Sequence, residues 1–111
     1  MREETRRAIA NAAAPRNDGE HRPVFSQDAG AWTNMSWTAE GFFDHEAQAH
    51  VTLTPEGFFH HGLNAHVRLE TEGGQFHGFD HASSEPFNGA VQGKHVIIRD
   101  AASGRFHRYE V

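Results

Sequence analysis

The side chains best suited to chemistry in this chain recur at equivalent places of a repeated segment, and they are His45, His61, His81 and Asp100. Imidazole nitrogens and a carboxylate oxygen bind divalent transition metals at about 2.0–2.2 Å. If the elements that carry these residues converge, the set would form a metal centre. The alternative is that the four side chains cap the core and bond to the backbone of turns. Both hypotheses depend on how the repeated segments fold.

The repeated segment has the pattern of a strand, a turn and a second strand. Its two clearest copies are Phe43–Val51 and Phe59–Val67, which share Phe, His, Ala, His and Val at matching positions. Looser copies follow at Phe79–Phe87 and Ile98–Phe106. Each copy begins with an apolar residue, passes through a polar run and ends with an apolar residue, which is typical of a hairpin. The sequence therefore predicts four hairpin repeats.

These repeats predict an all-β fold: an eight-stranded antiparallel up-and-down meander that closes into a barrel, preceded by a short N-terminal helix. Strands are expected at about 32–43, 49–54, 57–60, 65–70, 75–80, 86–91, 94–99 and 105–110. Turns such as Pro55-Glu56-Gly57, Glu72-Gly73-Gly74 and Gln92-Gly93 keep the connections short, and short connections join antiparallel neighbours. Closure removes the exposed edges of the meander. Two stacked four-stranded sheets are the alternative.

Alternation along the strands assigns the four candidate metal ligands to one face. The residues expected to point inward are Val51, Leu53, Val67, Leu69, Phe87 and Val91. The preceding strands would then contribute a core layer of Phe43, Phe59, Phe79 and Ile98. The candidate ligands follow two residues later and would face one mouth of the barrel. Neighbouring members would lie about 9–10 Å apart along a flat sheet, so only closure could bring them to one ion.

The N-terminal third of the chain predicts an arm and a linker. Residues 1–14 are rich in alanine and predict a helix, whose apolar face of Ile9 and alanines would dock weakly. We therefore expect a surface helix or a partner-contacting arm. Residues 15–30 are rich in Pro, Gly, Asn and Asp and predict a linker to the β domain of residues 31–111. Trp32, Trp37 and Ile9 are candidates for an interface, with core positions the alternative for the tryptophans.

Catalytic motifs are missing from the sequence. His45, Glu46 and His50 resemble a zinc-protease signature, but the histidines are five residues apart rather than four. That spacing would turn them about 140° apart on a helix, so the motif is rejected. The chain has no Cys, no phosphate-binding glycine loop and no nucleophile elbow. An enzyme is therefore the less favoured interpretation.

Composition and charge narrow the classes of partner. The formal net charge of −5 disfavours nucleic-acid binding through phosphate contacts. No apolar run approaches the ~18 residues of a membrane span or resembles a secretory signal, so we expect no membrane partner and a cytoplasmic location, or one inside a larger assembly. The chain has 10 histidines, which titrate near neutral pH. Of these, His50 and His66, with His60 on the strand between them, could form an exposed patch that binds metal weakly or responds to pH; the alternative is that they are solvated surface residues.

The sequence thus predicts a non-catalytic β domain that acts as a binding or structural interaction module, with a protein partner or a second copy of the chain. The alternative is a metal-binding protein that uses His45, His61, His81 and Asp100 for a divalent transition metal, by analogy with cupin-like barrels. A carrier of a small apolar ligand is a third hypothesis. The expected phenylalanine core leaves little volume for such a ligand.

Overall fold

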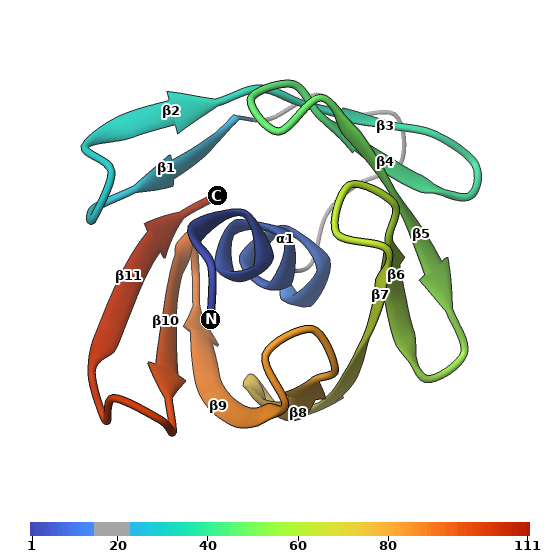
Figure 1. Cartoon of the computed structure of the whole chain (residues 1–111). Coiled ribbons are helices and arrows are strands. Elements are labelled where there is room, and N and C mark those ends of the chain that lie inside the picture. The colour runs from blue at the N-terminus through green and yellow to red at the C-terminus, as the bar shows by residue number, and fades with distance from the viewer. Residues whose placement is uncertain (15–22) are drawn as a thin grey trace.

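The computed structural model describes residues 1–14 and 23–111, in which it has one helix and eleven strands. The elements are α1 (Glu3–Ala13), β1 (Val24–Ser26), β2 (Ala31–Thr33), β3 (Met35–Trp37), β4 (Gly41–Asp44), β5 (Ala49–Thr54), β6 (Gly57–His60), β7 (Ala65–Glu72), β8 (Gln75–Asp80), β9 (Glu85–Gln92), β10 (His95–Asp100) and β11 (Phe106–Glu110). All strands belong to one antiparallel sheet that is nearly closed into a barrel (Figure 1). The all-β barrel and the preceding helix are confirmed, but the described strands number eleven rather than eight.

The additional strands all lie in the N-terminal part of the sheet. β1 comes from the expected linker, part of which, residues 15–22, lies outside the described residues. The expected strand at 32–43 is divided into β2, β3 and β4. Thr38 explains the second division, because its Oγ1 accepts hydrogen bonds from the N–H groups of Glu40 (3.3 Å) and Gly41 (3.2 Å) and closes a turn. The later strands lie within two residues of their predicted positions.

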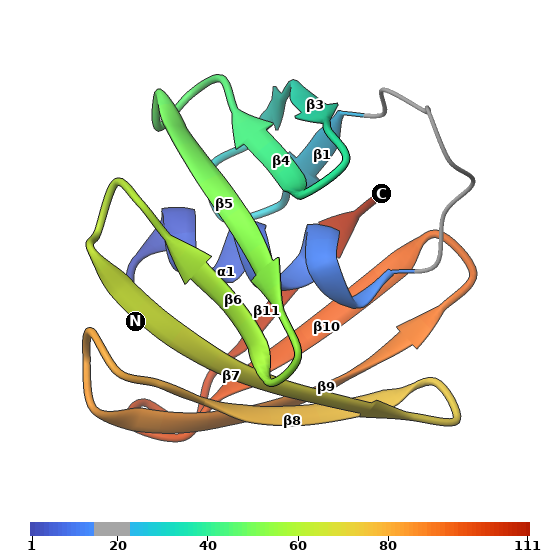
Figure 2. The same ribbon diagram turned by 90° about the vertical axis from the view of Figure 1, so that its right-hand side faces the viewer.

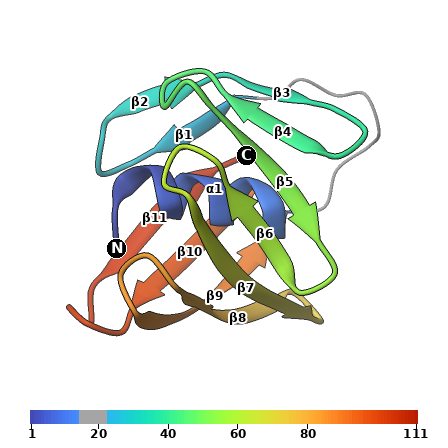
Figure 3. The same cartoon turned by 45° about the vertical axis from the view of Figure 1, so that its right-hand side comes forward.

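The two edges of the nearly closed sheet are joined by the continuity of the chain. The sheet order is β2-β1-β11-β10-β9-β8-β7-β6-β5-β4-β3, so β2 and β3 are its two edges. These edge strands are consecutive in the chain and are separated by Asn34 alone. β2 pairs with β1, whereas β3 pairs with β4. One short stretch of chain therefore brings both edges of the sheet together (Figure 3).

Helix α1 lies inside the ring of strands, as Figures 1 and 2 show from two directions. Residues 7–11 are all buried, and five successive residues of a helix point to every side. The expectation of a surface helix or partner-contacting arm is therefore wrong. Ile9 belongs to the core and has 0% exposure, so it is not an interface residue. Alanines that would dock weakly on a surface keep the helix narrow enough for the barrel.

The register of the hairpins decides which phenylalanines form the core. Phe42 lies opposite Val51, and Phe58 lies opposite Val67. Directly opposed residues share a face of the sheet, and Phe42 and Phe58 are accordingly 1% and 0% exposed. The predicted core layer is wrong for three of its members, because Phe43, Phe59 and Phe79 lie half-buried on the outer face. Ile98 is buried as expected.

Two glycines allow close contact between β8 and β9. Gly78 lies opposite Phe87, and Gly89 lies opposite Phe76. A Cβ on Gly89 would lie 2.3 Å from Cζ of Phe76 and 2.2 Å from the carbonyl oxygen of Ile97. Only glycine leaves room for the aromatic ring there, so the curvature of the sheet and the burial of the two phenylalanines depend on each other.

Candidate functional site

The inner side of each repeat ends in a buried polar residue just before a turn, and these residues are Asp44, His60, Asp80 and Asp100. Each side chain caps its own turn. Oδ1 of Asp44 accepts hydrogen bonds from the N–H groups of Glu46 (2.9 Å) and Ala47 (3.0 Å), and Nδ1 of His60 accepts one from Leu63 (3.2 Å). Asp80 and Asp100 accept corresponding bonds from Ala82 and Ala102. The four side chains at this equivalent position of the repeats therefore stabilise the turns.

Asp44 also connects the barrel to the central helix. Nε of Arg7 donates a hydrogen bond to Oδ2 of Asp44 at 2.9 Å, and the two side chains are 6% and 0% exposed. Removing one partner of such a buried pair leaves an uncompensated charge, which costs about 3–5 kcal/mol. The pair therefore fixes α1 relative to β4.

His60 differs from the three aspartates because it can titrate near neutral pH. Its ring is buried on the inner face, and its Nε2 has no hydrogen-bond partner among the described residues. Burial, partly opposed by the nearby charge of Asp44, lowers the pKa of His60. The predicted surface patch of His50, His60 and His66 is therefore wrong in placing His60 outside.

The four predicted metal ligands do not share a face. His45, His61 and His81 are exposed on the outer side of the barrel, whereas Asp100 is buried on the inner side. A slip of one residue in register moves a side chain to the other face. No group of three or more His, Asp or Glu side chains in residues 1–14 and 23–111 is arranged to hold a metal ion. Metal binding by the four residues together stays a prediction that this geometry does not support.

The two predicted interface tryptophans have different surroundings. Trp32 is 58% exposed, and its ring centroid lies 5.1 Å from that of Phe25 on the neighbouring strand. Trp37 is half-buried, and its centroid lies 4.6 Å from that of Phe42. Trp32 is therefore the more accessible candidate for an interface, which stays a prediction.

On the outer face, the half-buried phenylalanines pack against exposed histidines. The ring centroid of Phe43 lies 5.0 Å from that of His45 and 4.8 Å from that of His50. Phe59 repeats this arrangement at 4.8 and 4.7 Å, with His61 and His66. These edge contacts give the first two repeats the same outer surface.

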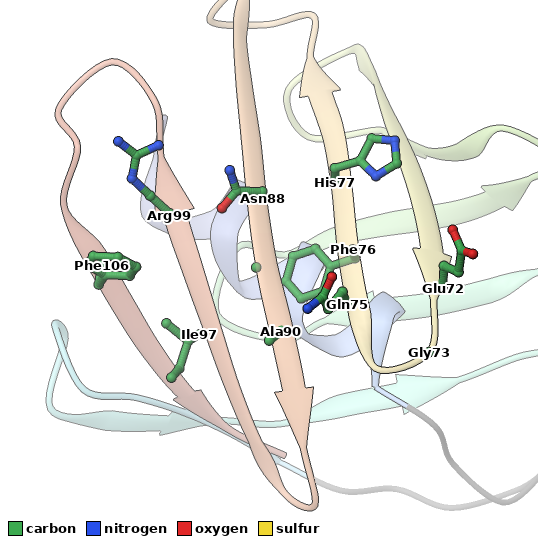
Figure 4. Close-up of a pocket in the computed structure, with 11 residues that line it drawn as sticks. Glu72, Gly73, Gln75, Phe76, His77, Asn88, Ala90, Ile97, Arg99 and Phe106 are labelled. Carbon is green, nitrogen blue, oxygen red and sulfur yellow. The ribbon is translucent and has the colours of Figure 1, made fainter.

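A groove of about 810 Å³ lies on the outer side of β8, β9, β10 and β11 (Figure 4). This volume falls within the range of about 300–1,000 Å³ that is typical of ligand sites. Cross-strand pairing builds one row of its lining: His77 opposes Asn88, Asn88 opposes Arg99, and Arg99 opposes Phe106. Ile97 lines the groove beside this row. The groove therefore combines hydrogen-bonding side chains with apolar surface.

The two ends of the groove differ in charge. None of the ion pairs within the described residues involves Arg99, and Phe106 beside it is 61% exposed. Glu72 and His77 lie toward the other end (Figure 4). Nε2 of His77 is 2.8 Å from a carboxylate oxygen of Glu70. The arrangement can bind an anionic group at the Arg99 end and an apolar group beside it.

Sequence reasoning missed this groove because its residues lie singly on different strands. The signal was present in the turns: Gly73-Gly74 and Gly93-Lys94 are two-residue hairpin connections, which fix the register of the strands they join. From that register, Asn88 and Arg99 could have been placed side by side.

Two further findings concern the chain as a whole. Among the described residues, no helix is both long and apolar enough to cross a membrane. Comparison with known proteins gives no family for this chain: it matches no protein-family model, no curated protein and no solved structure.

Proposed function

We propose that this chain is a non-catalytic binding module that holds a short segment of a partner protein in the groove on β8–β11. The observation that carries the proposal is the row of Asn88, Arg99 and Phe106. An amide, a guanidinium without an ion-pair partner among the described residues and an exposed aromatic ring lie side by side there. A fold alone does not specify a function, whereas the side chains of such a site select a ligand.

The chemistry of the row selects an acidic and apolar segment. The planar guanidinium of Arg99 can donate two parallel hydrogen bonds to a carboxylate. Phe106 and Ile97 offer apolar surface to a neighbouring side chain of the partner. The carboxyl groups of Glu70 and Glu72 near the other end would repel a long polyanion, so a peptide segment fits better than nucleic acid.

The expected affinity is low. An exposed Arg–carboxylate pair contributes at most about 1 kcal/mol, and burial of one large apolar side chain contributes about 1.5–3 kcal/mol. A minimal acidic and apolar peptide should therefore bind with a Kd of about 1 mM or weaker. A complete partner would add contacts around the groove.

Amide chemical shifts of the 15N-labelled chain test the proposal with two peptides, N-acetyl-Leu-Asp-Leu-amide and N-acetyl-Leu-Asn-Leu-amide. We expect the Asp peptide to shift amides of β8–β11 and the Asn peptide to bind several-fold more weakly. Arg99→Gln should remove this difference, while Arg68→Gln, at an exposed position on β7, should keep it. Equal binding of the two peptides, or shifts confined to another surface, would refute the proposal. Concentration-dependent shifts of β8–β11 without peptide would identify a second copy as the occupant instead.

A further inference from the structure

Two pairs of exposed histidines lie opposite each other, each joining a strand residue, His50 or His66, to the first residue of a turn, His61 or His81. The N–H of His61 donates a hydrogen bond to the carbonyl oxygen of His50 at 2.9 Å, and the N–H of His81 donates one to that of His66 at 3.1 Å. The next positions in register, Val51 with His60 and Val67 with Asp80, are buried inside. All four paired histidines therefore point to the outer face.

The separation of such a pair suits chelation. Directly opposed residues of an antiparallel sheet have Cβ atoms about 4.5–5.5 Å apart. When two imidazoles bind one metal, each places a nitrogen about 2.0–2.1 Å from the ion. A cross-strand pair can meet this requirement by turning its two rings toward each other. The side chains are exposed, so rotation of their rings does not disturb the core.

We propose that His50 with His61, and His66 with His81, form two equivalent binding sites for a divalent transition metal, each completed by water. Imidazole nitrogen favours copper, nickel and zinc over magnesium and calcium. These sites differ from the four-residue centre expected from the sequence, because each uses two histidines and neither uses Asp100. They are also independent of the groove on β8–β11.

The present contacts of the rings show what coordination replaces. Nε2 of His61 lies 2.9 Å from Oγ1 of Thr52, so binding at the first site exchanges this hydrogen bond for a metal bond. His50 and His66 lie edge-on against Phe43 and Phe59. These contacts order the imidazole of His50 on β5 and that of His66 on β7, and the same arrangement occurs in two successive repeats.

Copper binding to the full chain tests the sites. It is measured by calorimetric titration with CuCl2 at a pH above the ordinary histidine pKa of about 6.5, and the bound ion is examined by electron paramagnetic resonance. We expect two ions per chain, each with two coordinated nitrogens. His50→Ala and His66→Ala should each remove one ion, and His61→Ala and His81→Ala should repeat these losses. His95→Ala is the control, because His95 is exposed and opposes Gln92 and Glu110 rather than histidine.

The folding of each variant is checked by its melting temperature without metal, which we expect to match that of the unchanged chain because the replaced side chains are exposed. Binding of two ions that survives in the His50→Ala/His66→Ala double variant would overturn the proposal. A stoichiometry below two in the unchanged chain, or a signal from single-nitrogen coordination, would overturn it as well.

Discussion

The four repeats are alike on the inner side of the barrel, whereas on the outer side only the first two are alike. Inside, every repeat ends in a buried polar cap, namely Asp44, His60, Asp80 and Asp100. Outside, the equivalent cross-strand pairs are Phe43–His50, Phe59–His66, Phe79–Pro86 and Arg99–Phe106. The inner positions share one task, which is to close turns around the central helix. The outer positions do not close turns, and the strands of the third and fourth repeats together line the groove.

The largest expected effect is on the inner side. Asp44→Ala removes a turn cap and leaves Arg7 buried without its partner, so we expect a loss of about 3–5 kcal/mol in the free energy of unfolding. Urea denaturation measures it. Glu46→Ala, an exposed change in the same turn, should stay within about 0.5 kcal/mol. A small effect of Asp44→Ala would contradict the role of the Arg7–Asp44 pair.

One inner cap, His60, should make the stability of the chain depend on pH. The pKa of His60 is lowered in the folded chain. As the pH falls below the ordinary histidine pKa of about 6.5, the unfolded chain therefore takes up a proton at His60 before the folded chain does. The contribution of neutral His60 is thus complete above that pH and is lost as the pH falls through the lowered pKa. His60→Asn should flatten this part of the stability curve.

Urea denaturation at a series of pH values from neutral to mildly acidic follows the effect. His61→Asn is the matched control, since His61 is the exposed neighbour of His60. Identical curves for the unchanged chain and His60→Asn would show that His60 is not the titrating group.

A smaller effect is expected at the fourth residue after each inner cap. Gln48, Asn64, Ser84 and Gly104 all have positive φ, and Ser84 has a φ of 56°. Ser84→Gly relieves this strain and should stabilise the chain by about 0.5 kcal/mol, because the gain exceeds the entropy cost of glycine. Ser83→Gly should instead destabilise it by about 1 kcal/mol through loss of the 2.7 Å hydrogen bond to Asp80. Thermal unfolding compares the two, and a destabilising Ser84→Gly would contradict this view of the turns.

Local patterns made the repeats and most strands predictable, since alternation and turn residues act over a few positions. Which of the adjacent residues Phe42 and Phe43 faces the core could not be predicted from such local patterns. It depends on the length of the turn after Asp44, whose positive-φ residue is Gln48 rather than the usual glycine or asparagine. The predicted register was wrong by one residue, and it therefore placed His45, His61 and His81 on the inner face instead of the outer face.

The place of the helix was not predictable for a different reason. Its alanines predict helix, but whether such a helix lies outside or inside depends on the width of the barrel. Eight strands are expected to fill their interior with side chains, whereas the described sheet has eleven strands and encloses α1. The width of the barrel is a property of the whole chain, which no short segment encodes.

The most direct test of the groove is to give the fourth repeat the outer surface of the first. Arg99→Phe with Phe106→His reproduces the pair formed by Phe43 and His50, and since both sites are exposed the stability should change by only about 0.5 kcal/mol. The measurement is the titration of 15N-labelled double variant with N-acetyl-Leu-Asp-Leu-amide. We predict a folded spectrum without peptide-induced shifts on β8–β11. A folded double variant that binds the peptide as the unchanged chain does would contradict the assignment of binding to this groove.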